Sequence, residues 1–219
     1  MTRTDGRTAL LDAAERLFAE QGIPQVSDRK VADAAGHKNH SAVAYYFGSR
    51  DGLLRALLDR QTASFEEARE RLFTQSDSLL GDVRSFVLPM TQTFAALPTP
   101  SWRARFLART LGDANAAARG REVLESTPLT LKIGASLLSR MTHVDRAIAV
   151  GRARLMTRIM IDTCADVERA AEGGEDPRWE AVGQFLADAI TGMLQAPSSQ
   201  SSHYPAIDDP SGPTAASGR

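Results

Sequence analysis

Residues 27–50 combine cationic side chains with hydroxyl, amide and phenol groups at close spacing. Residues 28–55 hold five Lys and Arg side chains and three Asp side chains, which gives this segment a charge of +2 in a chain of net charge -1. Such groups can bind phosphate oxygens, and several cations usually contribute to phosphate binding. The sequence therefore predicts a small, local basic surface and not a wholly basic protein.

Two short helices joined by a glycine turn are expected to position these groups. Ser27 can cap a helix that ends at Gly36, where a tight turn needs positive φ. Asn39 can cap a second short helix, which closes at Phe47. A helix over about residues 5–21 braces this pair. The arrangement is typical of a helix-turn-helix, which lays its second helix in the DNA major groove.

The rest of the chain also has helical periodicity, so we predict an all-α fold. Ser49 can cap a helix that runs through Phe65. The later predicted helices span residues 79–97 with a kink at Pro89, 102–118, 128–141, 145–172 and 178–195. This pattern predicts a DNA-binding domain over 1–48, a larger helical domain over 49–196, and a disordered tail over 197–219.

Composition argues against several other classes. Cys164 is the single cysteine among 219 residues, which excludes an intramolecular disulfide and favours a reducing, cytoplasmic location. The first twenty residues are amphipathic and lack a secretion signal, and the charge-free run 85–102 contains three prolines, so we expect no membrane association. We find no glycine-rich phosphate loop, nucleophile motif or metal-ligand cluster, which predicts no enzymatic activity, no cofactor and no metal ion.

Three segments follow one another within residues 7–58: "LLDAAERLFAEQG", "VADAAG" and "YYFGSRDGLL". Through these segments, residues 7–58 resemble the DNA-binding domain of the TetR family of bacterial transcriptional repressors. Beyond them the resemblance is one of helical architecture only. The resemblance implies that residues 49–196 form a helical ligand-binding and dimerisation domain. It implies a ligand-responsive regulator, most simply a repressor, that binds double-stranded operator DNA.

By this similarity, nine residues fall where the family contacts DNA. Lys38, Asn39, His40 and Ser41 would lie at the start of the recognition helix and read base edges, while Ser27, Arg29, Tyr45, Tyr46 and Arg50 complete the set. Of these, Ser27, Tyr45, Tyr46 and Arg50 would grip phosphates. The alternative for Tyr46 is that it packs in the core with a satisfied hydroxyl. The alternative for His40 is that it is a surface residue without a role in DNA binding.

Three positions depart from the commoner family pattern. The turn between Gly36 and Phe47 is one residue longer, Ala44 stands where a tyrosine often contacts phosphate, and Arg50 replaces a lysine. Ala44 and the small local charge leave open a rival hypothesis, a helical protein-interaction or ligand-carrier module with degenerate DNA binding. A helical enzyme is the third alternative.

The C-terminal helical pair is expected to form the dimer interface. An inverted-repeat operator needs two recognition helices held about 34 to 36 Å apart by a two-fold homodimer. The pair 145–172 and 178–195 would pack against its symmetry mate as a four-helix bundle. The predicted interface residues are Ile148, Leu155, Ile159, Phe185, Ala189, Ile190 and Met193.

The resemblance also implies a pocket for an unknown small-molecule inducer, which would have an apolar part. The predicted lining is Phe94, Trp102, Phe106, Leu137 and Met141, with Arg105 and His143 as polar anchors. Ordinary core packing is the alternative for each of them. An inducer that binds better to the widely spaced state than to the DNA-competent state would lower operator affinity.

Overall fold

The computed structural model describes residues 3–198, and every regular element in that range is helical. The elements are α1 (Arg3–Gln21), the 3-10 helix η1 (Ile23–Gln25), α2 (Asp28–Ala34), α3 (Ala42–Phe47), α4 (Arg50–Ala63), α5 (Glu66–Thr74), α6 (Leu79–Ala95), α7 (Arg103–Gly112), α8 (Ala114–Glu125), α9 (Pro128–Arg140), α10 (Arg146–Glu172) and α11 (Trp179–Gln195). The predicted all-α fold is confirmed. Apart from Pro197 and Ser198, the predicted tail lies outside the described residues.

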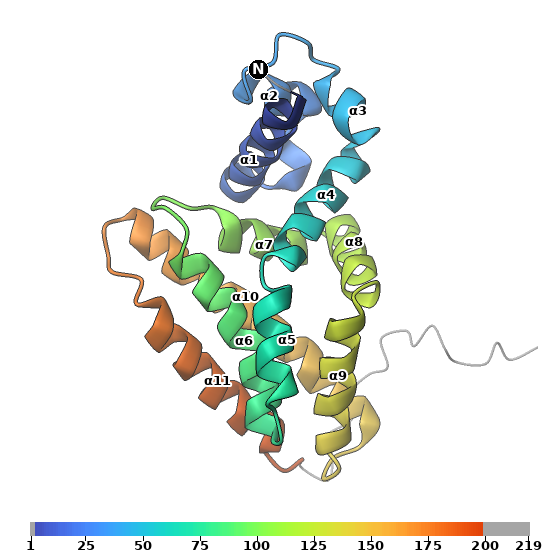
Figure 1. Cartoon of the computed structure of the whole chain (residues 1–219), viewed down its shortest axis with the longest axis vertical. Coiled ribbons are helices and arrows are strands. Elements are labelled where there is room, and N and C mark those ends of the chain that lie inside the picture. Colours follow the sequence, from blue (N-terminus) through green and yellow to red (C-terminus); the bar gives the residue numbers. More distant parts are fainter. Residues whose placement is uncertain (1–2, 199–219) are drawn as a thin grey trace, which may run out of the picture.

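A small bundle of α1–α3 sits at one end of the molecule, and α4 leads from it into a larger bundle (Figure 1). The small bundle shares an apolar core with α4, to which α4 contributes Leu53 and Leu57. A second core joins α6, α9, α10 and α11. Helix α7 supplies Phe106 to the first core and Ala104 to the second, so it packs between the two units.

Several predicted helix boundaries agree with the structure. The hydroxyl of Ser27 accepts a hydrogen bond from the Lys30 amide at the start of α2, and that of Ser49 accepts one from the Gly52 amide at the start of α4. Helix α6 continues through Pro89. The long C-terminal pair, α10 and α11, lies within one residue of the predicted ends.

Three predicted elements differ from the structure. Asn39 does not cap α3; Ser41 holds that position, and the Asn39 amide oxygen accepts a hydrogen bond from the Ser41 amide. The helix expected to run through Phe65 ends at Ala63, and α5 follows it. The helix expected over 102–118 is two helices, because Asp113 has extended backbone angles and caps α8 through the Ala116 amide.

Helix α11 approaches α6 closely at Gly183. A Cβ at this glycine would lie 2.5 Å from the Thr91 hydroxyl oxygen and 3.0 Å from Leu88 Cδ2. One end of the same contact is closed by Phe94 and Trp179, whose ring centroids are 5.4 Å apart. The apolar face of α11 therefore packs on α6. None of the described helices is long and apolar enough to cross a membrane.

Cys164 lies on the buried face of α10 and is expected to be unreactive in the native protein. Burial, with a smaller contribution from Glu168, raises the pKa of its thiol to about 12. The unfolded chain has the lower pKa of an exposed thiol, so this thiol's contribution to stability is present below that pKa and is lost as the pH rises toward 12. At pH 8 a disulfide reagent should label the native protein very slowly and the denatured protein at once. Rapid labelling without denaturant would contradict the buried position. Cys164→Ser, which has no thiol, is the control for background reaction.

Candidate nucleic-acid interface

The candidate interface is built on α2, the turn that follows it, and α3. Gly36 has a φ of 74° and reverses the chain after α2, and the amide of His37 donates to the Ala32 carbonyl at 2.9 Å. Val31 and Val43 are buried, so α2 and α3 pack on the first core through one face each. The opposite face of α3 is left exposed. This is the geometry that a helix entering the major groove requires.

The residues predicted to read bases lie around the amino end of α3. Lys38, Asn39, His40 and Ser41 are all exposed, but they belong to the turn and the helix cap and not to α3 itself. The Asn39 amide oxygen is engaged by the Ser41 amide at 2.9 Å. His40 Nε2 lies 3.0 Å from Asp33 Oδ1 on α2. Both contacts fix the shape of the turn.

The two tyrosines of α3 have different surroundings. The Tyr45 side chain is 68% exposed, which leaves its hydroxyl available to a partner. Tyr46 is half-buried and meets the His37 ring edge-on, with centroids 5.8 Å apart. A Cβ at Gly6 of α1 would lie 2.6 Å from the Tyr46 hydroxyl, and His37 Nε2 is 3.3 Å from the Gly6 carbonyl. Tyr46 and His37 therefore seat α3 against the first turns of α1.

The remaining predicted contacts also have partners within the chain. Arg50 pairs with Asp28 at 3.0 Å, donates to the Ile23 carbonyl, and lies over the Phe18 ring at 5.1 Å. These contacts tie the start of α4 to α2 and α1. Arg29 is more available, since its side chain is 71% exposed and its pair with Asp33 is 3.8 Å long. Ser27 is exposed, with its oxygen engaged as the cap of α2.

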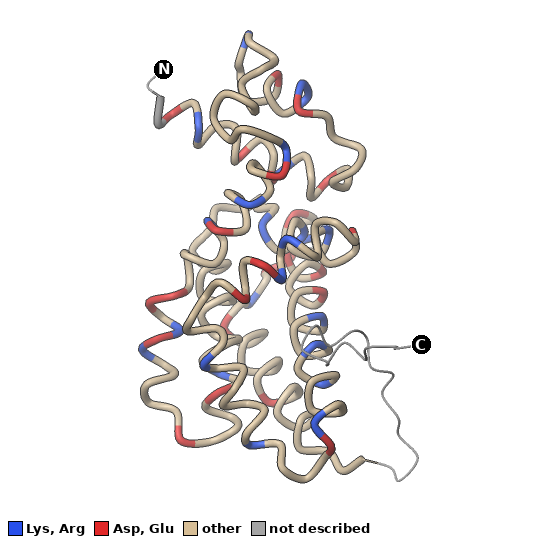
Figure 2. Tube along the Cα trace, turned by 90° about the vertical axis from the view of Figure 1, so that its right-hand side faces the viewer, with Lys and Arg blue, Asp and Glu red and all other residues tan. Residues whose placement is uncertain are grey.

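Basic and acidic positions are interspersed along the chain trace of both units (Figure 2). Two acidic residues of α2 have basic partners: Asp28 pairs with Arg50, and Asp33 pairs with Arg29 and lies beside His40. These contacts offset part of the negative charge beside α3. Lys38 makes no ion pair within the part of the chain that the structure describes, which makes it the plainest candidate for a phosphate or base contact.

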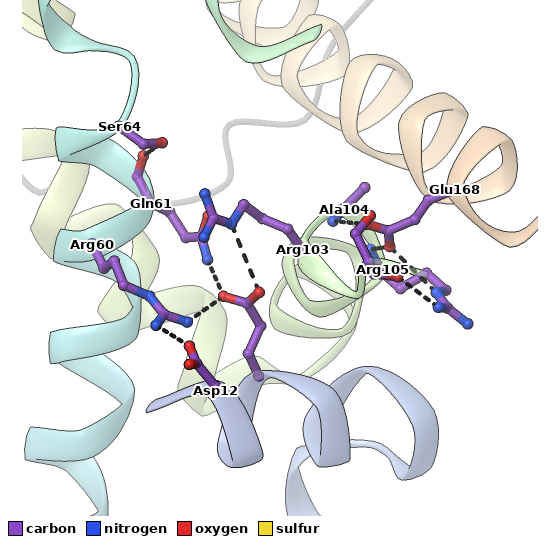
Figure 3. Close-up of polar contacts among 10 residues, drawn as sticks. Asp12, Arg60, Gln61, Ser64, Arg103, Ala104, Arg105 and Glu168 are labelled. Carbon is purple, nitrogen blue, oxygen red and sulfur yellow. Dashed lines mark hydrogen bonds and ion pairs between the residues drawn. The ribbon is translucent and has the colours of Figure 1, made fainter. Parts of the chain in front are cut away.

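A carboxylate on α1 connects this unit to the rest of the molecule. Glu15 is 8% exposed and accepts hydrogen bonds from Arg60 at 2.7 Å and Gln61 at 2.6 Å, both on α4. Arg103 of α7 lies 3.7 Å from its other oxygen. Figure 3 shows Arg60, Gln61 and Arg103 converging on this point, with Asp12 beside Arg60. Three helices are thus joined through one buried charge.

The amino-terminal turn of α7, which carries Arg103, is also held by α10. Glu168 is 2% exposed, and its carboxylate accepts from the Ala104 amide at 3.2 Å and from the Arg105 amide at 2.9 Å (Figure 3). The Ser101 hydroxyl donates to it at 2.7 Å, and the Arg105 guanidinium pairs with both Glu168 and Glu172. A carboxylate satisfies the free amides of a helix start and suits its dipole. Helix α7 is therefore anchored to α10 and also contacts α1.

The residues predicted to line an inducer pocket are divided between the two cores. Phe94, Leu137 and Met141 pack in the second core, whereas Phe106 stacks on Phe18 in the first, with centroids 6.3 Å apart. Trp102 is half-buried against the first core, Arg105 is engaged by Glu168 and Glu172, and His143 is exposed. The structure does not bring these seven residues around one cavity.

Open concavities lie elsewhere on the described part of the chain. One, of about 450 Å³, lies between α5 and α9 and is lined by Glu66, Glu67, Glu70, Pro128, Leu129 and Lys132. The second, of about 300 Å³, lies where α1, α7 and α10 meet and is lined by Ala19, Glu20, Arg105, Ala108, Arg109 and Arg169. Arg105 is the one predicted residue that borders either of them.

Arg69 pairs with Glu66 of the first concavity's lining and is almost fully buried between two aromatic rings. Its guanidinium is 4.3 Å from the ring centroids of Phe65 and Phe86. Burial lowers the pKa of Arg69 to about 10, and it raises the pKa of neighbouring Glu66. Arg69 also lies 3.4 Å from the Thr130 hydroxyl, so it joins α5 to α6 and α9.

The predicted dimer residues fall on different faces of the C-terminal pair. Phe185 is 66% exposed, Leu155 is 46% exposed, and Ala189 is also exposed. Ile148, Ile159 and Met193 are half-buried. Ile190 is 1% exposed because it faces the second core, so in this structure it cannot meet a second subunit without leaving that core.

Three positions near α3 were not singled out from the sequence. Arg7 is exposed on α1 with its guanidinium 5.1 Å above the Phe47 ring, which places a further cation beside α3. Gly6 and Gly52 both sit inside helices where a side chain would collide with α3. A glycine within a helix costs about 1 kcal/mol of stability relative to alanine. A glycine in an otherwise good helical pattern therefore indicates that another segment packs closely against the helix at that position.

Comparison with known proteins gives the family of the amino-terminal unit. Residues 10–57 match the family described as "Bacterial regulatory proteins, tetR family". None of the curated proteins matches the chain.

Among solved structures, the fold is similar to that of a TetR-like transcriptional regulator from Rhodococcus sp. RHA1, with 22% identity, 89% of this chain and 96% of that chain covered, and a TM-score of 0.57. It is also similar to a putative tetR family transcription regulator from Shewanella sp. PV-4, with 19% identity, 85% and 95% covered, and a TM-score of 0.56. Residues 10–57 thus match the tetR family of bacterial regulatory proteins, and the fold of the chain is similar to that of these TetR-like regulators.

Proposed function

We propose that the protein is a transcriptional repressor that binds an inverted-repeat operator as a homodimer and is released by a small-molecule inducer. The observation that carries this proposal is the exposed face around α3, with Lys38, Tyr45 and Arg29 outward on a unit that matches a family of bacterial regulators. Binding to chromosomal DNA requires a cytoplasmic location.

We assign different roles to the exposed and the engaged side chains of this face. Tyr45 and Arg29 contact phosphates, because each presents an exposed polar end. Lys38, His40 and Ser41 approach base edges from the turn before α3, and Asn39 joins them through its free amide nitrogen. Arg50 and Tyr46 hold α3 in position through their contacts with α1 and α2. The additional cation at Arg7 supports the phosphate contacts.

Lys38→Gln is expected to weaken DNA binding and to flatten its salt dependence. Each cation that displaces condensed counterions from the DNA contributes close to one unit to the slope of log affinity against log salt, so removing one cation per subunit should lower that slope by about 1 to 2 per dimer. The matched control is Lys132→Gln, which removes the same charge from the exposed side of α9. The measurement is fluorescence anisotropy on labelled DNA flanking the protein's own gene, across a salt series and beside a scrambled duplex.

The result also separates the two leading functions. Binding that prefers the native flank, and whose affinity is lowered by Lys38→Gln and Tyr45→Phe but unchanged by Lys132→Gln, supports the regulator. Weak binding of equal strength to both duplexes and by all variants would argue against it and favour the interaction-module hypothesis.

We place the dimer interface on the outward faces of α10 and α11. Support comes from the exposed apolar side chains of Phe185 and Leu155, together with Ala189 and with Gly192, where a Cβ would meet no atom within 4 Å. Two such pairs related by a two-fold axis would form a four-helix bundle. Ile148, Ile159 and Met193 would border the contact.

Phe185→Arg is expected to convert the dimer to a monomer. An exposed residue contributes within about 0.5 kcal/mol to the stability of an isolated subunit, so the variant should fold normally. Light scattering coupled to size exclusion at micromolar concentration measures the change in mass. A wild-type protein that is monodisperse and monomeric under these conditions would contradict the proposed dimer.

The inducer would act by shifting the population between two spacings of the recognition helices. Its site in the larger helical unit stays a prediction. A candidate molecule qualifies only if it lowers operator affinity, because a ligand with equal affinity for both states shifts nothing.

A further inference from the structure

The concavity between α1, α7 and α10 has features of an anion-binding site. Its lining contains three arginines, Arg105 and Arg109 from α7 and Arg169 from α10, and one carboxylate, Glu20 from α1. Ala19 and Ala108 supply small apolar walls. Its volume of about 300 Å³ suits a small organic molecule.

The three arginines differ in how far they are already engaged. The Arg105 guanidinium already has partners within the chain, because it pairs with Glu168 and Glu172 and donates to the Ser101 carbonyl. Arg169 makes one pair with Asp166, in which the two side chains are 62% and 75% exposed. Such an exposed pair contributes little and can be exchanged for another partner.

Arg109 is the residue best placed to receive a ligand. Its Nε donates to the Ala19 carbonyl in the last turn of α1 at 3.3 Å. No acceptor for its two terminal nitrogens is found within residues 3–198. A guanidinium held by Nε presents those two nitrogens as a fork, which matches the two oxygens of a carboxylate or phosphate.

The site is separate from the DNA-facing surface. It borders Ala19 and Glu20, whereas α3 packs near Gly6 at the other end of the same helix. Fourteen residues of α-helix span about 21 Å. A DNA phosphate bound at α3 therefore cannot fill this concavity.

We propose that the concavity at the α1, α7 and α10 junction binds a small oxyanion, a carboxylate or phosphate group on a compact body, through Arg109 and Arg169. Glu20 in the lining disfavours ligands with several negative charges and selects for a single anionic head group. The two alanines favour a ligand with a small apolar part. A molecule bound there touches the DNA-binding unit and the larger helical unit at once.

The test is isothermal titration calorimetry on the full chain without DNA, so its outcome does not depend on the proposed function. Benzoate and inorganic phosphate serve as probes, titrated at constant ionic strength against chloride. The wild type is expected to bind at least one of them saturably with a dissociation constant of about 1 mM or lower. Tighter binding of benzoate would show that the alanine walls contribute.

Three variants locate the site. Arg109→Gln/Arg169→Gln should weaken binding at least about tenfold, since both charge-assisted contacts are lost. Arg169→Gln alone leaves the Arg109 contact with α1 intact and should weaken binding by a smaller factor. Arg121→Gln/Arg146→Gln removes two exposed arginines outside the lining and should bind as the wild type does. Thermal melts verify that each variant is folded.

No saturable heat from the wild type with either probe would overturn the proposal. It would also be overturned by equal affinities of the Arg109→Gln/Arg169→Gln and Arg121→Gln/Arg146→Gln variants.

Discussion

Glu168→Ala is expected to lower the free energy of unfolding by about 3–5 kcal/mol, as is usual when one partner of a buried ion pair is removed. The carboxylate is 2% exposed and accepts from the Ala104 and Arg105 amides and from the Arg105 guanidinium. Alanine leaves these donors without an acceptor in an environment that water reaches poorly. For a protein of this size the melting temperature should fall by about 6–20 °C. Thermal and urea unfolding followed by circular dichroism measure both quantities.

Glu172→Ala is the matched control, because Glu172 pairs with the same arginine one turn further along α10. Its side chain is 44% exposed, so the pair contributes at most about 1 kcal/mol. Glu168→Gln should lie between the two, since it keeps an oxygen for the α7 amides and loses the charge. Equal destabilisation by Glu168→Ala and Glu172→Ala would contradict the role assigned to the buried carboxylate.

The same residue explains how the two units are joined. Glu168 fixes the first turn of α7, and α7 carries Arg103 toward Glu15 and Arg109 toward the Ala19 carbonyl. Helix α10 is therefore connected to α1 through one short helix. Helix α7 contacts α1 through the ion pair at Glu15, the hydrogen bond to Ala19 and the stack of Phe106 on Phe18.

Local signals in the sequence were sufficient to predict most of the helices. Ser27 and Ser49 were identified as caps because a hydroxyl before an apolar helical pattern has that specific use, and both make the expected hydrogen bond. The α10 and α11 pair was predicted from its long apolar periodicity and the intervening glycine and proline turn. These features depend on residues within one or two turns of each other.

Missed boundaries arose where local signals conflicted. Phe65 continues the apolar pattern of α4, yet the helix ends at Ala63 and Phe65 packs in the second core at the start of α5. The break before α8 had a usable signal, since Gly112 and Asp113 form a typical stop and cap. Asn39 is as good a cap as Ser41 by residue type, but its amide oxygen accepts from the Ser41 amide in the turn before α3.

The contacts that join the units could not be predicted from periodicity. The Glu168 carboxylate and the Ala104 amide are 64 residues apart, and nothing in their neighbourhoods specifies the pairing. Ile190 illustrates the same difficulty on α11, whose apolar stripe is wide enough to serve both a core and an interface. Only the packing of α11 on α6 determines that Ile190 is inside and Phe185 outside.

Gly52→Ala is expected to displace the recognition helix and to abolish specific DNA binding. A Cβ at Gly52 would lie 2.0 Å from the Phe47 carbonyl oxygen and 3.1 Å from its carbonyl carbon. These are backbone atoms at the end of α3, so no side-chain rotation can relieve the collision, and α3 or α4 must move. Overpacking of this kind costs about 1–3 kcal/mol. Anisotropy on the operator duplex, together with thermal unfolding, measures the two effects.

Gly134→Ala provides the control that isolates the collision from the substitution itself. Gly134 lies within α9, and a Cβ there would meet no atom within 4 Å. Alanine should therefore stabilise α9 by about 0.5–1 kcal/mol and leave DNA affinity unchanged. Both variants add one methyl group to a helical glycine. If only Gly52→Ala loses stability and operator binding, the loss can be traced to the contact with Phe47. Normal operator affinity in Gly52→Ala would mean that the α3 to α4 junction yields without moving the DNA-facing surface, and the positioning role given to Gly52 would then be wrong.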